Sequence, residues 1–237
     1  RKIQDNIHHL YGVDAARYEE IHNRLKIQRI YGMVPSNLEN KKKRIVAKNI
    51  ENKQGKRMRD YLEEFDYLIS SGITLEVKAI SKPSFPLIEN SGKNLLKLYM
   101  NDVGILTNIF FGTNIKAVLD DIASINLGSV YETVVAQELK AHGFNLYYYD
   151  NKKIGEVDYL IDDRPHLSVL PIEVKSGKDY QVHSALDKFL KIKEYNIHEA
   201  FVLSNAQQVE VKDGITYLPI YYIMCIDAED SDKDIYL

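Results

Sequence analysis

The chain has 237 residues, of which 45% are hydrophobic and 27% are charged, and its net charge is −3. This length suits one large or two small domains, and the composition excludes a chain too polar to bury a core. No signal peptide and no apolar run long enough to cross a bilayer is visible, and the single cysteine, Cys225, excludes an internal disulfide framework.

The surroundings of Cys225 and the start of the chain suggest where the protein works. Cys225 lies in the apolar run Tyr221–Ile226, which predicts a strand with a core thiol. A lone cysteine favours a reducing compartment, and we therefore expect a cytoplasmic protein. The sequence opens at Arg1 in charged, helix-like sequence, so we expect it to be a piece of a longer protein.

The charges are divided unevenly along the chain. Residues 1–120 hold 20 Lys+Arg against 14 Asp+Glu, whereas residues 121–237 hold 11 against 20. Such a split suggests two modules with different partners. The basic excess is concentrated between residues 41 and 59, where a DNA-binding surface is the specific hypothesis and a solvated charged face the alternative. The candidate nucleic-acid-binding residues are Lys41, Lys42, Lys43, Arg44, Lys56 and Arg57.

Residues 1–112 predict helices followed by a short β-ribbon. Apolar residues recur at helical spacing in two segments, a proline marks a turn between them, and two apolar strands follow. Helix, turn, helix, helix and ribbon is the order of a winged-helix-like domain. The predicted helices cover 14–27 and 55–68, the turn and start of a short helix cover 35–38, and the strands cover 73–80 and 97–100.

In residues 113–237 the predicted helices and strands alternate in a different order. This order predicts a mixed sheet with helices packed against it, which is an α+β or mixed fold class. The expected helices are 129–141 and 180–195, and the expected strands are 145–149, 155–161, 170–175, 200–203 and 215–223.

Two of these strands carry charged residues in alternation with apolar ones. Because residues i and i+2 of a strand face the same way, Glu156 and Asp158 should lie opposite Val157, and Glu173 should share a face with Lys175. The short polar segment 163–166 between the strands favours a hairpin. Two carboxylates and one ammonium group would then meet on one sheet.

This set of groups suits metal-dependent phosphodiester cleavage. Mg²⁺ prefers carboxylate oxygens, water and substrate phosphate as ligands. Asp158 and Glu173 are the candidate metal ligands, for Mg²⁺ or Mn²⁺, and Lys175 would orient the attacking water or offset charge at phosphorus. Glu132, on the helix expected to pack beside these strands, would support the metal. Glu132, Asp158, Glu173 and Lys175 are therefore the candidate catalytic residues.

A helix glutamate, a strand aspartate and Glu-x-Lys on the next strand resemble the PD-(D/E)XK nuclease signature. The wider chain resembles an uncharacterised domain that follows an AAA+ ATPase domain in predicted bacterial and archaeal ATPases. The segments that carry this resemblance are Val34–Leu38, Asn40–Lys42, Lys97–Ile105, Gly128–Glu132, Gly155–Asp158, Ile172–Lys175 and Leu218–Tyr221.

The resemblance implies a winged helix over 1–112, a restriction-endonuclease-like domain over 113–237, and an N-terminal ATPase domain as partner. No ATPase is visible in the chain itself. Ser91–Asn94 and Ser176–Asp179 both lack the upstream glycine and the following Ser or Thr of a P-loop. We expect no nucleotide hydrolysis from these residues.

Several candidates have a structural alternative. Ser129 and Glu132 also fit a capping box, in which the glutamate bonds back to the serine amide. Glu156 also fits a solvated strand edge, and Glu76–Lys78 repeats the Glu-x-Lys pattern without a partner aspartate. The seven histidines show no metal-ligand spacing and are expected to be structural or exposed.

Three hypotheses follow. The first is a Mg²⁺-dependent endonuclease site acting on DNA, with the winged helix positioning the substrate. The second is a non-catalytic docking or regulatory module for the ATPase on a degenerate nuclease scaffold, which the acidic second half favours because acidic surfaces repel phosphates. The third is a winged-helix DNA-binding regulator.

Overall fold

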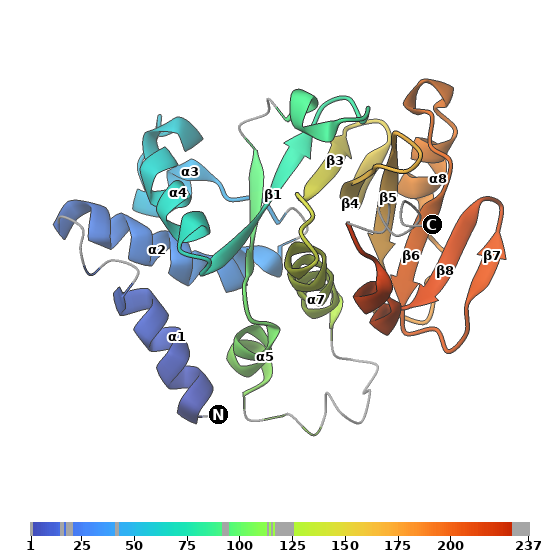
Figure 1. Cartoon of the computed structure of the whole chain (residues 1–237). Coiled ribbons are helices and arrows are strands. Elements are labelled where there is room, and N and C mark those ends of the chain that lie inside the picture. The colour runs from blue at the N-terminus through green and yellow to red at the C-terminus, as the bar shows by residue number, and fades with distance from the viewer. Residues whose placement is uncertain are drawn as a thin grey trace, which may run out of the picture. The chain divides into compact units, whose positions relative to one another are not determined.

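The computed structural model describes residues 2–14, 17, 21–40, 43–91, 95–112, 114, 116 and 126–228 (Figure 1). The chain divides into two compact units. Unit 1 comprises residues 1–76 and 94–125, and unit 2 comprises residues 77–93 and 126–237. The segment 77–93 thus belongs to unit 2, although the sequence suggested a single boundary between residues 112 and 113.

Unit 1 consists of helices and strand residues. Its elements are α1 (Lys2–Asp14), α2 (Ile21–Leu38), α3 (Ala47–Glu51), the 3-10 helix η1 (Met58–Tyr61), α4 (Leu62–Ser70), the first residues of β1 (Thr74–Ile80), β2 (Leu96–Met100) and α5 (Val103–Phe111). Helix α2 contacts α3, α4 and β2, and α1 contacts α5. The Asp102 side chain caps α5 by accepting hydrogen bonds from the amides of Gly104 and Ile105.

Helix α2 supplies much of the core of unit 1. Ile27, Ile30, Val34 and Leu38 recur at helical spacing, and each is at most 1% exposed. Pro35 lies inside this helix, so the turn predicted at 35–38 is wrong. Proline removes one backbone donor, and the buried apolar side chains on either side of it stabilise the helix despite that loss.

The helix predicted over 14–27 has the wrong bounds. Helix α1 ends at Asp14 and α2 begins at Ile21, while residues 15, 16 and 18–20 lie outside the described residues. The apolar residues behind the prediction do not form one buried stripe, since Ile21 is 76% exposed. The later prediction over 55–68 corresponds to η1 and α4.

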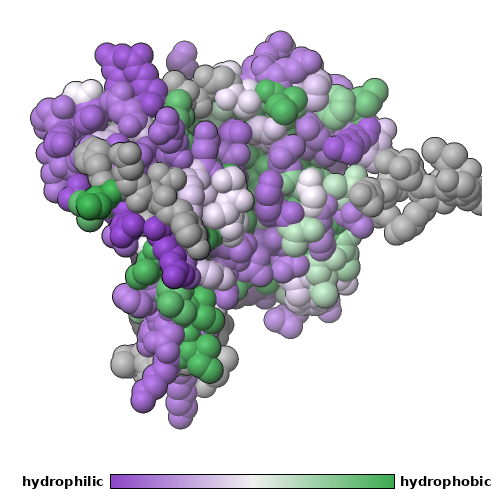
Figure 2. Space-filling view, turned by 60° about the vertical axis from the view of Figure 1, so that its left-hand side comes forward, coloured by the Kyte–Doolittle hydropathy of each residue, from purple (hydrophilic) through white to green (hydrophobic). Residues whose placement is uncertain are grey.

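Helix α1 buries none of its residues. Its apolar side chains Ile3, Leu10 and Val13 are exposed. Figure 2 shows apolar residues beside polar ones on the lower part of the surface, at the height of α1 and α5 in Figure 1. None of the helices in the described part of the chain combines the length and apolar character that a membrane span requires.

Unit 2 is a sheet with helices packed against it. Its elements are the remainder of β1, η2 (Leu87–Asn90), α7 (Gly128–Ala141), β3 (Tyr147–Asn151), β4 (Gly155–Asp163), β5 (Ser168–Val174), α8 (Ser184–Leu190), η3 (Lys193–Tyr195), β6 (Ala200–Ser204), β7 (Glu210–Lys212), β8 (Ile215–Pro219) and η4 (Ile220–Cys225). Helix α7 contacts β5 and η4, and α8 contacts β4.

The described strands form one mixed sheet of eight strands in the order β2-β1-β3-β4-β5-β6-β8-β7. The pairs β1–β3, β5–β6 and β6–β8 are parallel, whereas β3–β4, β4–β5 and β7–β8 are antiparallel. The predicted mixed fold is confirmed. The ribbon predicted as a wing differs from expectation, because residues 78–80 of β1 pair with residues 147–149 of β3 and extend the sheet of unit 2.

The core of unit 2 is rich in aromatic rings. Phe189 of α8 is fully buried, and its ring contacts Tyr149 at a centroid distance of 5.0 Å and Tyr195 at 5.1 Å. Tyr147, Tyr148 and Tyr149 of β3 are also buried. Cys225 is exposed at the end of η4, so the prediction of a core thiol in a strand is wrong. The apolar run turns into a 3-10 helix after Pro219, which directs that side chain outward.

Candidate active site

The hairpin predicted from the charged strands is confirmed. Strands β4 and β5 pair antiparallel from Tyr159 opposite Ile172 to Asp163 opposite Ser168. Asp163 fixes the turn, because its carboxylate accepts a hydrogen bond from the Ser168 hydroxyl at 2.9 Å. Continuing the register by one residue places Asp158 opposite Glu173, and cross-strand neighbours lie on the same face of a sheet.

Strand β4 carries an irregularity at the candidate aspartate. Tyr147 pairs with Leu160 and Tyr149 with Val157, so two residues of β4, Asp158 and Tyr159, oppose a single residue of β3. This is a β-bulge, a feature that bends a strand and redirects its side chains. The strict alternation predicted around Val157 is therefore wrong, since Val157 and Leu160 pack in the same apolar cluster.

The side chains of Asp158, Glu173 and Lys175 meet at the end of β5. The Asp158 Oδ2 atom accepts a hydrogen bond from the Val174 amide at 2.9 Å. The Lys175 Nζ atom donates to Glu173 Oε1 at 2.7 Å. The backbone amide of Lys175 donates to the Leu203 carbonyl at 2.8 Å, which ties this end of β5 to β6.

Glu173 is a buried carboxyl group with an oxygen available to a ligand. The residue is 5% exposed, and burial raises the pKa of its carboxyl group above the ordinary value even though Lys175 lowers it. Its Oε2 atom is buried and has no hydrogen-bond partner among the described residues. Burying a polar atom without a partner costs free energy, so this oxygen is suited to an additional ligand.

Lys175 remains a cation at this site. Burial alone would lower the pKa of its ammonium group, but the Glu173 carboxylate outweighs this effect, with further help from Asp158 and Glu132, and the pKa is raised. The side chain keeps 29% of its surface exposed. A protonated lysine can donate hydrogen bonds and stabilise negative charge, whereas it cannot accept a proton as a general base.

Glu132 joins the group from α7. The residue is 6% exposed, and its charge influences the pKa values of both Glu173 and Lys175. Its backbone carbonyl accepts a hydrogen bond from the buried Tyr159 hydroxyl at 2.8 Å, which joins α7 to β4. The capping box proposed for Ser129 is wrong, because the helix begins at Gly128 after Leu127, and no side chain caps it.

Sequence reasoning missed a buried cluster beside Glu173. His183 is 5% exposed, its Nε2 atom hydrogen-bonds the Tyr217 hydroxyl at 2.7 Å, and Asp187 Oδ1 lies 2.9 Å from its Nδ1 atom. A charge on His183 would lower the pKa of the Glu173 carboxyl. The spacing of His183 and Asp187, four residues apart at the start of α8, was the available signal.

A divalent cation fits part of this arrangement. In the described residues no group of three or more His, Cys, Asp and Glu side chains is arranged to hold a metal ion. Mg²⁺ often takes only one or two protein carboxylates and completes its shell with water and phosphate. The unpartnered Oε2 atom of Glu173 offers one such carboxylate oxygen, and Asp158 lies on the neighbouring strand β4.

The candidate nucleic-acid-binding residues belong to unit 1, and Lys41 and Lys42 lie outside the described residues. Arg44 forms an isolated antiparallel bridge with Lys97. The Lys56 Nζ atom lies 5.8 Å from the centre of the Tyr61 ring. Arg57 is exposed, and its amide donates to Asp60 Oδ2 at 2.9 Å. DNA binding by Lys43, Arg44, Lys56 and Arg57 stays a prediction.

Comparison with known proteins gives two family matches. Residues 1–116 match the model of a domain of unknown function (DUF8612), and residues 127–223 match that of another domain of unknown function (DUF4143). No curated protein and no solved structure matches the chain. The second match spans all four candidate catalytic residues, so the site lies within a region similar to an uncharacterised domain family.

Proposed function

We propose that unit 2 carries a Mg²⁺-dependent phosphodiester hydrolase site of the PD-(D/E)XK type, acting on DNA. One observation carries the proposal. The buried Glu173 carboxylate accepts a hydrogen bond from Lys175 with one oxygen, and its other oxygen has no partner among the described residues. Asp158 and Glu132 lie beside this pair. A protein gains no stability from an unsatisfied buried carboxylate oxygen, so a functional ligand is the reason that fits its presence.

Each residue has a role in this proposal. Asp158 and Glu173 would hold the metal ion, which supplies Lewis-acid stabilisation of a phosphoryl oxygen and lowers the pKa of water. Lys175, a protonated donor, orients the attacking water and offsets negative charge at phosphorus. Glu132 adds a carboxylate charge that acts on Glu173 and Lys175.

The reaction is hydrolysis with a simple balance. The water oxygen forms a bond to phosphorus, and the bond from phosphorus to one sugar oxygen breaks. The water gives up a proton, and the departing sugar oxygen takes one up. The products are a phosphomonoester and an alcohol, and no oxidant or reductant is required.

Substrate binding in this proposal also involves unit 1. The helices there are proposed to act as a DNA-binding module, with Lys43, Arg44, Lys56 and Arg57 as phosphate contacts. Phosphate contacts of this kind position a DNA strand without reading its sequence.

The test is cleavage of single-stranded, duplex and branched DNA with Mg²⁺ or Mn²⁺. Asp158→Asn and Glu173→Gln should each lower the rate by about 100-fold or more, because they remove ligand charge while keeping side-chain shape. Glu194→Gln changes an exposed acid elsewhere in unit 2 and should leave the rate unchanged. If the natural sequence cuts none of these substrates with either ion, the proposed hydrolase activity is refuted.

A second candidate is a non-catalytic docking or regulatory module for an ATPase domain. The Lys175–Glu173 ion pair favours it, because an internal cation already neutralises the carboxylate that would hold the metal. Titration calorimetry separates the two. Binding of Mn²⁺ that disappears in Asp158→Asn and Glu173→Gln supports the hydrolase, whereas no binding by the natural sequence supports the docking module.

A further inference from the structure

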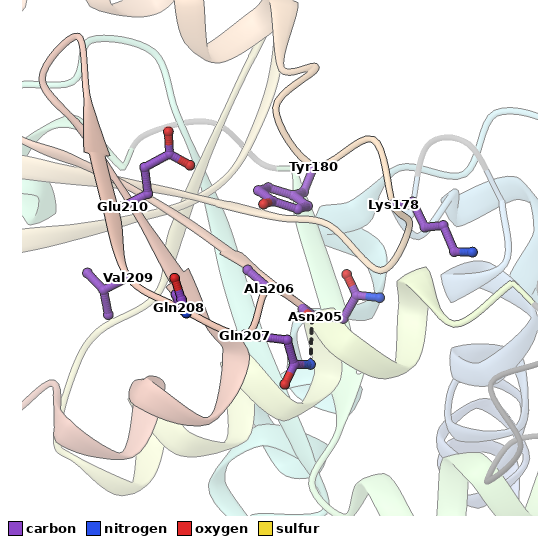
Figure 3. A pocket seen from close by; sticks show the side chains of 8 residues that line it. All are labelled: Lys178, Tyr180, Asn205, Ala206, Gln207, Gln208, Val209 and Glu210. Carbon is purple, nitrogen blue, oxygen red and sulfur yellow. Dashed lines mark hydrogen bonds between the residues drawn. The ribbon is translucent and has the colours of Figure 1, made fainter.

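A cleft lined by both polar and apolar groups opens beside the candidate active site (Figure 3). It lies between the segment that follows β5 and the loop that joins β6 to β7, and its volume is about 570 Å³. That volume is in the range of small-molecule sites in proteins. The lining residues are Lys178, Tyr180, Asn205, Ala206, Gln207, Gln208, Val209 and Glu210.

The topology of the sheet places this cleft next to Lys175. Strands β5 and β6 are parallel neighbours, so the chain leaves both at the same edge of the sheet. The backbone amide of Lys175 donates a hydrogen bond to the Leu203 carbonyl at that edge, and Asn205 follows Leu203 two residues later. Lys178 is three residues beyond Lys175, which limits their backbone separation to about 11 Å. A strand with a phosphate at Lys175 can therefore reach the cleft with a neighbouring nucleotide.

The groups around the cleft differ from end to end. Figure 3 shows Lys178 and Glu210 on opposite sides of Tyr180, with the amide side chains of Asn205 and Gln207 below the ring. Each amide offers both donors and an acceptor. The cleft thus combines one cation, an aromatic ring, several amides and one carboxylate.

Tyr180 and Glu210 are held by neighbouring side chains. The Tyr180 ring packs edge-on against Tyr217 at a centroid distance of 6.1 Å. The Gln181 amide donates to Glu210 Oε2 at 3.4 Å. The aromatic wall of the cleft is therefore supported by Tyr217, whereas the acidic end is exposed.

We propose that this cleft binds one unpaired nucleotide of the DNA strand that is cut at Glu173 and Lys175, an inference that rests on the proposed function. Lys178 is the contact for a phosphate, and the Tyr180 ring stacks on the base. The amides and Glu210 meet the donor and acceptor edge of the base. The substrate is consequently single-stranded DNA or a duplex with locally unpaired bases.

Two physical arguments favour an unpaired base over a duplex. A base inside a duplex has both faces stacked and its pairing edge occupied, so it cannot reach an aromatic wall and amides at once. The acidic second half of the chain also offers little general attraction to a dense row of duplex phosphates. Stacking on Tyr180 does not depend on that charge.

The experiment is equilibrium binding of fluorescently labelled oligonucleotides to the full chain in EDTA, where hydrolysis is off. Single-stranded DNA should bind about ten-fold more tightly than the same sequence as a blunt duplex. Tyr180→Leu should weaken single-strand binding about ten-fold with no change in salt dependence. Lys178→Ala should weaken it several-fold and reduce the salt slope by about 0.7, the value for one phosphate contact on a single strand.

Matched variants keep the test decisive. Lys191→Ala removes an exposed lysine outside the cleft and should change neither affinity nor slope. Gln207→Ala alters an exposed cleft residue, so it should weaken binding even if Tyr180→Leu perturbs packing against Tyr217. Unchanged affinity in both Lys178→Ala and Gln207→Ala overturns the inference.

Other outcomes are equally informative. Duplex binding as tight as single-strand binding overturns the preference for unpaired bases, and tighter binding of single-stranded RNA overturns the assignment to DNA. Cleavage is scored separately with Mg²⁺. If the cleft variants weaken binding but no cleavage product forms, the proposed hydrolase activity is overturned and the proposed strand-binding cleft stands. If cleavage occurs and the cleft variants do not affect it, the strand-binding cleft is overturned and the hydrolase activity stands.

Discussion

Lys175→Met should lower the free energy of unfolding by about 3 kcal/mol at pH 7. The substitution leaves the Glu173 carboxylate buried without its cation, and breaking one partner of a buried ion pair typically costs about 3–5 kcal/mol. The Nζ to Oε1 distance of 2.7 Å and the 5% exposure of Glu173 put this pair in that class. We choose the lower end because the lysine side chain is partly exposed.

The loss should depend on pH in a direction fixed by Glu173. Its pKa in the folded protein is already raised by burial, and removal of Lys175 raises it further. A carboxyl whose folded pKa lies above its unfolded value favours folding at low pH, and that contribution is lost as pH rises through the folded pKa. The Lys175→Met variant should thus be most destabilised at neutral and alkaline pH, and its stability should recover as the pH falls toward 4.5, the ordinary pKa of a glutamate.

The check is urea denaturation of Lys175→Met, Glu173→Gln and the double variant across this pH range. Glu173→Gln keeps an oxygen that accepts from Lys175 and should be far less destabilising. The double variant should regain most of the stability lost by Lys175→Met, because no buried charge is left. A pH-independent loss that the double variant does not relieve would show that Glu173 is not the source.

Gly155→Ala should destabilise unit 2 by about 2–4 kcal/mol. Gly155 has φ of +112°, a conformation that residues with a Cβ atom rarely adopt. A Cβ atom built there would lie 2.9 Å from the Cβ atom of Ala185 in α8. Backbone strain and overpacking each typically cost about 1–3 kcal/mol, and the two act together here.

Gly177→Ala is the matched control for this effect. Gly177 is exposed, and a Cβ atom added there meets no heavy atom within 4 Å. Its substitution should change stability by no more than about 0.5 kcal/mol. Thermal unfolding followed by circular dichroism measures both, and a Gly155→Ala variant as stable as Gly177→Ala would contradict the close approach of α8 to β4.

The β4–β5 hairpin was predictable because its signals are local. Apolar alternation defined both strands, and the short polar segment at 163–166 implied that they pair. The approach of Asp158 to Glu173 and Lys175 followed from that pairing. Gly155, part of the segment Gly155–Asp158, has a role that only the structure explains, since its constraint comes from α8, which is distant in sequence.

The features that sequence reasoning missed depend on distant partners. The bulge at Asp158 exists because of the register with β3, which no pattern within β4 specifies. His183 hydrogen-bonds Tyr217, which lies 34 residues away in the sequence, and neither residue type predicts this contact. A capping box was the structural alternative for Glu132 because its spacing from Ser129 is right, although the helix starts before that serine.

The interleaving of the units sets a limit on how the protein can be divided for experiments. A recombinant fragment that starts at residue 113 would lose residues 78–80, and β3 would then present unpaired amides and carbonyls along an open margin. The fragment would also lose Leu87, whose side chain is fully buried and whose backbone amide donates a hydrogen bond to Asp162 Oδ1 at 2.9 Å. Self-association through β3 is the expected defect, so the intact polypeptide is the appropriate material for activity assays.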